Sequence, residues 1–216
     1  MKGFFITGTD TEVGKSVVTA ALAAGFRARG QTPRAVKPLA SGSPPPGEDA
    51  SLLAKHAGHE PIGFTCLPTP ASPERAARQA GVTIDDDGLT DWCRAQSGDP
   101  LLMEGVGGWA VPLTSAMTVE DLAMSMRLPV IIVAANRLGM LNHTLLTVDA
   151  VRESGLTLAG LVINNAMGPS GELQDWNVAD LRRWVGPGTP ITVLGQLEGD
   201  ADFAPAGQAI IEALNL

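Results

Sequence analysis

One stretch near the amino terminus has the residue types and spacing that bind a nucleoside triphosphate. Residues 6–16 read ITGTDTEVGKS, follow a predicted strand and open a predicted helix, which is the context of a phosphate-binding loop. Gly14 lets backbone N–H groups approach phosphate oxygens, Lys15 can reach the β- and γ-phosphates, and the Ser16 hydroxyl can ligate Mg²⁺. The spacing departs from the usual pattern, because Thr9 stands where its first glycine is expected. The alternative is an ordinary turn between a strand and a helix.

Two carboxylates lie inside this loop, at Asp10 and Glu12. Beside a triphosphate they would repel the ligand, so we expect them to face a cation, an amine or a hydroxyl. The alternative is that both are solvated turn residues.

Lys37 and Asp49 are the next candidates along the chain. Lys37 closes a predicted strand, and the strand ends of open parallel sheets line the ligand crevice. A lysine there can neutralise charge that develops in phosphoryl or acyl transfer. The alternative is a surface lysine before a proline turn. Asp49 begins a predicted helix after the proline-rich loop 41–49, where it can be either an N-cap or a Mg²⁺ ligand.

Polar residues end two later apolar runs. Glu104 closes one and is followed by a glycine-rich turn, which lets a ligand approach the backbone. A buried glutamate there is costly without a metal, and an acidic residue at this place commonly holds Mg²⁺ beside a phosphate-binding loop. Asn164 and Asn165 close another run. Their amides can read a purine edge, although asparagine is also common in strand-end turns.

These side chains must be positioned by an alternation of strands and helices. We predict strands at Gly3–Thr7, Arg34–Lys37, Leu101–Glu104, Val130–Ala134, Leu158–Asn164 and Ile191–Leu194. We predict helices at Gly14–Arg29, Asp49–Ala57, Ser72–Gln79, Asp87–Gln96, Thr118–Met126, Leu141–Ser154, Gly171–Trp184 and Ala206–Leu214. Several strands are continuously apolar, as in strands covered on both faces. The order predicts an α/β fold with a mostly parallel central sheet and helices on both faces.

Composition narrows the class of protein. The chain has 216 residues, of which 44% are hydrophobic, so it can build a large core and we expect a single domain over residues 1–216. A net charge of −8 without a basic cluster argues against nucleic acid or anionic lipid as a partner. Two cysteines fit a reducing compartment. The longest apolar run, 128–135, is far shorter than the ~20 residues of a membrane span. We therefore expect a soluble cytoplasmic protein.

Taken together, the motifs resemble those of the dethiobiotin synthetase family along nearly the whole chain. They are, in order, GTDTEVGKS at 8–16, Lys37-Pro38 with Ser41-Gly42, EGVGG at 104–108 with VPL at 111–113, Leu138-Gly139 with Asn142-His143, and Asn164-Asn165. The TDTEVGK form of the loop is distinctive and accounts for its unusual spacing.

The resemblance implies a P-loop NTPase-like three-layer sandwich and a reaction that depends on ATP and Mg²⁺. The substrates would be 7,8-diaminononanoate, CO₂ and ATP, and the products dethiobiotin, ADP and phosphate. The path implied runs through a carbamate and a carbamic-phosphoric anhydride. The family is homodimeric, with the substrate tail held at the interface near Gly139–Asn142.

The resemblance also assigns residues. The catalytic pair would be Lys15 and Lys37. Nucleotide and Mg²⁺ would be bound by Glu12, Val13, Gly14, Lys15, Ser16, Val17, Asp49, Glu104, Gly105, Val106, Gly107, Asn164 and Asn165. The metal ligands among them would be Ser16, Asp49 and Glu104, and the diamine or its carbamate would meet Thr11, Glu12, Lys37, Ser41 and Asn142.

The chain departs from the family at three places. The segment 195–200, which follows the last strand, lacks the proline of the family's adenine loop. Trp176 occupies the place of a substrate-binding tyrosine, in a chain without tyrosine, and Glu74 stands where histidine is common.

Two other functions are weighed against the synthetase. Partition ATPases share such a fold but carry a lysine directly after the first loop glycine, whereas here Thr9 follows Gly8. The second is a paralogous carbon–nitrogen ligase that uses another amine.

Overall fold

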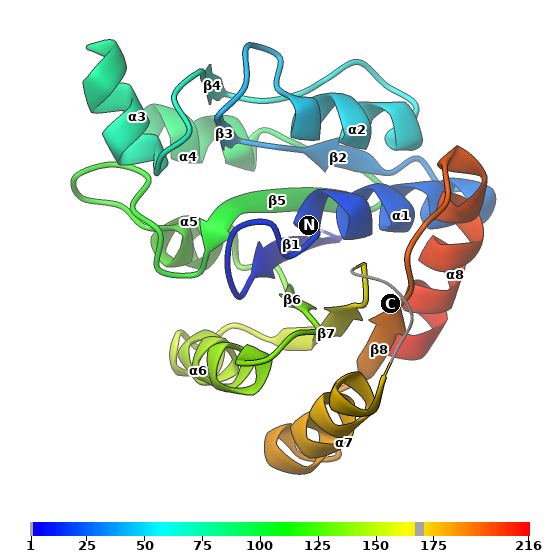
Figure 1. The fold of residues 1–216 in the computed structure, drawn as a ribbon. Coiled ribbons are helices and arrows are strands. Elements are labelled where there is room, and N and C mark those ends of the chain that lie inside the picture. Colours follow the sequence, from blue (N-terminus) through cyan, green and yellow to red (C-terminus); the bar gives the residue numbers. More distant parts are fainter. Residues whose placement is uncertain (1, 167–170) are drawn as a thin grey trace.

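A computed structural model describes residues 2–166 and 171–216 of the chain. Its centre is a six-stranded sheet in which every pair of neighbouring strands is parallel (Figure 1). Across the sheet, the strands follow the order β2 (Arg34–Val36), β5 (Leu101–Gly108), β1 (Gly3–Gly8), β6 (Val130–Ala135), β7 (Leu158–Asn164) and β8 (Ile191–Leu194). All six predicted strands are present, although β5 extends four residues beyond Glu104.

Helices cover both faces of this sheet and form the outer two layers. One face carries α1 (Lys15–Ala28), α2 (Glu48–Ala57) and α8 (Phe203–Leu214). The other carries α4 (Asp86–Arg94), α5 (Val119–Met126), α6 (Met140–Glu153) and α7 (Glu172–Val185). The predicted three-layer α/β sandwich is therefore confirmed.

The continuous apolar runs follow from this arrangement. Along β1, Phe5 belongs to the core under one helical layer and Ile6 to the core under the other, and both are fully buried. Ile131 and Ile132 of β6 divide between the two cores in the same way. Because successive side chains point to opposite faces, a strand between two layers needs an apolar residue at every position.

A second, two-stranded parallel sheet was not predicted. It pairs β3 (Leu39–Ser41) with β4 (Thr65–Leu67) and lies beside α3 (Pro73–Ala80). The segments LAS and TCL of these two strands carry too little pattern to recognise. The predicted start of the last helix at Ala206 is also wrong, because α8 begins at Phe203, whose ring is buried against the fold.

The parallel strands bring their carboxyl ends to one edge of the sheet, where the loops after β1, β2, β5, β6 and β7 gather (Figure 1). Within the described ranges, no helix has both the length and the apolar character needed to cross a bilayer.

Candidate functional site

The phosphate-binding loop occupies the turn between β1 and α1. Gly14 has φ +93°, and a Cβ at this position would overlap the side-chain amide of Asn164, so only glycine fits. Asn164 Nδ2 donates a hydrogen bond to the Val13 carbonyl oxygen at 3.1 Å in a buried position. The end of β7 therefore braces the loop, a contact that loop spacing alone does not reveal.

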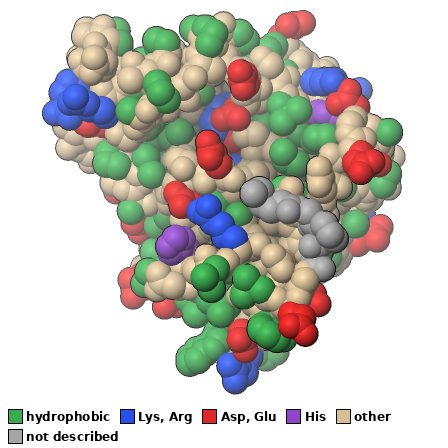
Figure 2. Space-filling view, in the orientation of Figure 1, with side chains coloured by type: hydrophobic (Ala, Val, Ile, Leu, Met, Phe, Trp, Pro, Cys, Tyr) green, Lys and Arg blue, Asp and Glu red, His purple; other side chains and the backbone are tan. Residues whose placement is uncertain are grey.

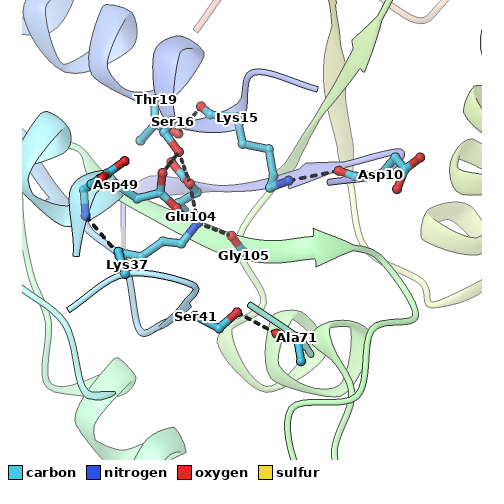
Figure 3. Close-up of polar contacts among 12 residues, drawn as sticks. Asp10, Lys15, Ser16, Thr19, Lys37, Ser41, Asp49, Ala71, Glu104 and Gly105 are labelled. Atoms are coloured by element: carbon cyan, nitrogen blue, oxygen red, sulfur yellow. Dashed lines mark hydrogen bonds and ion pairs between the residues drawn. The ribbon is translucent and has the colours of Figure 1, made fainter. Parts of the chain in front are cut away.

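Four predicted residues meet directly behind this loop (Figure 3). The Ser16 hydroxyl lies 2.7 Å from Asp49 Oδ1 and 2.7 Å from Glu104 Oε1. The Lys37 ammonium lies 2.6 Å from Glu104 Oε1 and 2.9 Å from Asp49 Oδ2, and it donates to the Gly105 carbonyl at 3.0 Å. We call Ser16, Lys37, Asp49 and Glu104 the acid–lysine cluster. Its members come from α1, the end of β2, α2 and β5.

Burial makes the charges of this cluster strongly interdependent. Glu104 is 0% exposed and Lys37 is 3% exposed. Burial disfavours the Lys37 cation, but the carboxylates of Glu104 and Asp49 outweigh that effect and raise the pKa of Lys37. For Asp49, burial acts against the anion, yet Lys37 and the Ser16 hydroxyl lower the pKa of the carboxyl. Lys37 is therefore held as a cation between two carboxylates.

Lys15 has a different electrostatic setting. Its ammonium donates to the Asp10 carbonyl at 3.0 Å, within the loop itself (Figure 3). Burial and the nearby charge of Lys37 lower the pKa of Lys15 to about 8, against smaller opposing effects of Glu104, Asp49 and Asp10. An anion bound in the loop would oppose both effects by favouring the Lys15 cation, so Lys15 is poised to gain a phosphate partner.

The donor set of the cluster fits Mg²⁺. A hydroxyl has one proton and can donate to only one of the two carboxylates that flank Ser16. Glu104 Oε2 is buried and has no hydrogen-bond partner among the described residues. A hydroxyl and two carboxylates are the oxygen ligands that Mg²⁺ takes beside nucleotide phosphates. A cation here would give Glu104 Oε2 a partner. It would also attract the Ser16 oxygen and both carboxylates, which one hydroxyl proton cannot satisfy together.

The remaining loop residues lie at the opening of the site. Thr11 and Glu12 are exposed, and Glu12 adopts φ +56°, which is uncommon for a residue with a side chain. Asp10 Oδ1 accepts from the Thr11 backbone N–H at 2.7 Å, while Asp10 Oδ2 pairs with Arg137 at 3.2 Å. Asp10 thus faces a cation, as expected. Figure 2 shows acidic and basic side chains close together along the hollowed middle of this face.

Other predicted residues are placed around the cluster or away from it. The Ser41 hydroxyl donates to the Ala71 carbonyl at 2.7 Å, and Val17 is half-buried in the first turn of α1. Val106 and Gly107 continue β5 beyond Gly105. Asn165 is buried, and its backbone N–H donates to the Leu194 carbonyl at 2.8 Å. Asn142 lies exposed in the first turn of α6, not in the acid–lysine cluster.

Arg137 was missed by the sequence reasoning, although a signal was available. It follows β6 by two residues, so the rule that places polar residues at strand ends near the ligand crevice covers it as well. The neighbouring Asn136 is buried and accepts from Asn177 Nδ2 of α7 at 3.0 Å. These contacts join the phosphate-binding loop to α7 through the end of β6.

Comparison with known proteins agrees with this geometry. Residues 2–206 match a protein family described as an AAA domain. The chain is 41% identical over 194 residues to the ATP-dependent dethiobiotin synthetase BioD of Anaeromyxobacter sp., covering 86% of each sequence. It is 42% identical to the BioD of Ralstonia nicotianae over 84% of this chain and 83% of that one. For the BioD of Serratia marcescens, the identity is 38% over 85% of this chain and 86% of that one.

Two solved structures share the fold at low sequence identity. A plasmid partition protein from Borrelia burgdorferi bound to AMPPNP gives a TM-score of 0.58 at 11% identity, covering 99% of this chain and 98% of the other. The McdA–ATP complex of Cyanothece gives 0.54 at 15% identity, covering 100% of this chain and 97% of the other. These likenesses concern the fold alone, whereas the relatives of higher identity share sequence along most of their length. The chain belongs to the ATP-dependent dethiobiotin synthetase family.

Proposed function

We propose that this protein closes the ureido ring of dethiobiotin from 7,8-diaminononanoate, CO₂ and ATP, with Mg²⁺, and that residues 1–216 form one synthetase domain. The single observation that carries the proposal is the acid–lysine cluster directly behind the phosphate-binding loop. Such a site suits transfer of a phosphoryl group in a setting where water is largely excluded. Identity of 38–42% to named synthetases supports the choice of substrates.

The proposed reaction has three steps. One amine of the diamine adds to CO₂ and loses a proton, which gives a carbamate. A carbamate oxygen then attacks the γ-phosphorus of ATP, which gives a carbamic-phosphoric anhydride and ADP. The second amine attacks the carbamoyl carbon and loses a proton, phosphate leaves, and the ring closes.

Lys15 and Lys37 are assigned to the charge that develops on the transferring phosphoryl group. Lys15 reaches it from the phosphate-binding loop, and Lys37 from the buried side of the cluster. Ser16, Asp49 and Glu104 would hold Mg²⁺, which neutralises charge on the β- and γ-phosphates. Because Lys37 is buried between two carboxylates, its charge is maintained at neutral pH.

The amine side of the site is assigned to Thr11, Glu12 and Ser41. The carboxylate of Glu12 is exposed beside the loop, where an amine can approach it. Since the Ser41 hydroxyl gives its proton to the Ala71 carbonyl, only lone pairs remain for a ligand. Ser41 is thereby set to accept a hydrogen bond from an amine rather than to donate one to a carboxylate.

The nucleotide would lie along residues 12–17, the Gly105–Gly107 backbone and the two asparagines Asn164 and Asn165. We also propose a cytoplasmic homodimer with the substrate tail near Gly139–Asn142. Large apolar side chains stand exposed around α6 and α7, which supports a covered surface there: Leu138 is 83% exposed, Leu146 62% and Trp176 59%.

The test is phosphate release from ATP and Mg²⁺ with bicarbonate, with and without 7,8-diaminononanoate, followed by mass detection of dethiobiotin. Diamine-dependent release with one dethiobiotin per phosphate is the expected result. Release that ignores the diamine would favour an ATPase of the partition type. Release that depends on a different amine would identify a paralogous ligase.

A further inference from the structure

The segment between β8 and α8 begins beside the nucleotide site. It runs through residues 195–199 and the short helix η1 (Asp200–Asp202) into α8. At its start, the Leu194 carbonyl accepts from the Asn165 N–H, and the adjacent Asn164 braces the phosphate-binding loop. Most residues from 195 to 201 are exposed. We call residues 195–202 the β8–α8 segment.

The sheet order indicates which end of a nucleotide would approach this segment. The acid–lysine cluster draws on β5 and the end of β2, which lie on one side of β1. Asn164 belongs to β7 and the β8–α8 segment follows β8, and both of these strands lie on the other side of β1. A nucleotide whose terminal phosphate lies at the cluster would therefore extend its base toward β7 and β8.

The far end of the segment is fastened to α2. Asp200 Oδ2 lies 2.5 Å from the Lys55 ammonium, and Asp200 Oδ1 lies 3.6 Å from His56 Nε2. The His56 ring also stacks on Phe203, with centroids 4.0 Å apart and planes at 14°. His56 and Phe203 are 7% and 8% exposed, so this stack is a buried joint between α2 and α8.

The contact of Asp200 with Lys55 is electrostatic, whereas the stack of His56 on Phe203 is apolar. Burial lowers the pKa of His56, against the opposing charge of Asp200, so the ring is neutral at pH 7. Lys55 is then the cation that pairs with Asp200, and the stack supplies the apolar contact. Asp49 lies in the first turn of α2 and Lys55 in the last, so the ion pair with Asp200 stands at the opposite end of this helix from the acid–lysine cluster.

We infer that Asp200 is a positioning residue, which holds the β8–α8 segment beside the nucleotide base through its ion pair with Lys55. The inference rests on the proposed function, in that the ligand is taken to be ATP. An exposed segment with few contacts must be ordered when a ligand packs on it, and an anchor at its far end reduces that cost. The anchor should therefore affect binding of the base and leave binding of the phosphates unchanged.

The experiment compares ATP with inorganic tripolyphosphate, which has phosphates but no base. Calorimetric titration with Mg²⁺ gives the Kd of each ligand for the wild type, Asp200→Asn, Asp200→Lys and the charge swap Lys55→Asp/Asp200→Lys. We expect Asp200→Asn to weaken ATP about two- to fivefold, the range of one exposed ion pair, and Asp200→Lys to weaken it more. Tripolyphosphate affinity should stay constant, and the swap should restore ATP affinity.

The control is Asp91→Asn, which removes an exposed carboxylate paired with Arg94 on α4. It should change neither Kd, and thermal unfolding of every variant verifies that the fold is retained. Equal weakening of both ligands, unchanged ATP affinity in Asp200→Lys, or no restoration by the swap would overturn the inference. The titrations need neither diamine nor CO₂, so a failure of dethiobiotin formation would count against the proposed function alone.

Discussion

Replacement of Lys37 by alanine is the sharpest test of the proposed chemistry. Lys37 is 3% exposed, and its ammonium contacts both carboxylates of the acid–lysine cluster. Its charge is most valuable when negative charge develops during phosphoryl transfer, whereas ground-state ATP binding is shared with the phosphate-binding loop. Loss of one such group costs about 10²–10³ in kcat, or roughly 2.7–4 kcal/mol. We expect kcat to fall by that factor while the Kd of ATP changes less than about threefold, roughly 0.6 kcal/mol.

The structure adds a second consequence for the free protein. Without Lys37, the fully buried Glu104 loses its ion-pair partner and faces Asp49 across the cluster. Breaking a buried pair in this way costs about 3–5 kcal/mol of stability. Mg²⁺ held by Ser16, Asp49 and Glu104 would supply positive charge that offsets the loss. The Tm of Lys37→Ala should therefore fall without metal and recover substantially with Mg²⁺.

The assay combines three measurements on the same preparations: kcat with saturating diamine and bicarbonate, the Kd of Mg²⁺–ATP by calorimetry, and Tm with and without Mg²⁺. Lys2→Ala is the matched control, because Lys2 is an exposed lysine paired with Asp99. Both residues precede their strands, whereas the site lies toward the carboxyl ends of those strands. Equal losses in ATP affinity and in turnover would refute the assignment of Lys37 to the transition state.

Three further predictions concern the loop and its support. Burial and Lys37 lower the pKa of Lys15 to about 8. Bound phosphate should raise this pKa, so that Lys15 takes up a proton when ATP binds near pH 8. ATP affinity should then fall with rising pH above 8, and calorimetry in buffers of different ionisation enthalpy should detect the uptake; a pH-independent affinity would contradict it. Glu104→Gln should raise the Mg²⁺ concentration needed for half-maximal activity by roughly tenfold or more, and an unchanged requirement would exclude Glu104 as a ligand. A Cβ at Gly207 would overlap the Ala21 carbonyl, so Gly207→Ala should cost about 1–3 kcal/mol in denaturant unfolding. Gly188→Ala, with open space around it, should cost less; equal costs would refute the packing argument.

The strands of the central sheet and the α-helices were predictable because their signals are local. A strand covered on both faces needs apolar residues throughout, and the run from Val130 to Ala134 meets that need in consecutive positions. The phosphate-binding loop is likewise a short stretch whose glycine, lysine and serine are adjacent in the chain. Strands β3 and β4 have three residues each. They are defined by their pairing with each other, which joins distant parts of the chain, and not by a pattern within either segment.

The sequence by itself determined the candidate residues and the strand, helix or loop on which each would lie. Only the tertiary structure decided that Ser16 meets Asp49, 33 positions away, and Glu104, 88 positions away. The order β2-β5-β1 brings these strand ends together, and local periodicity does not encode strand order. The bracing contact from Asn164 to the phosphate-binding loop and the stack of His56 on Phe203 have the same origin. Both join segments distant in the chain, because packing of the helices against the sheet places them at neighbouring positions in space.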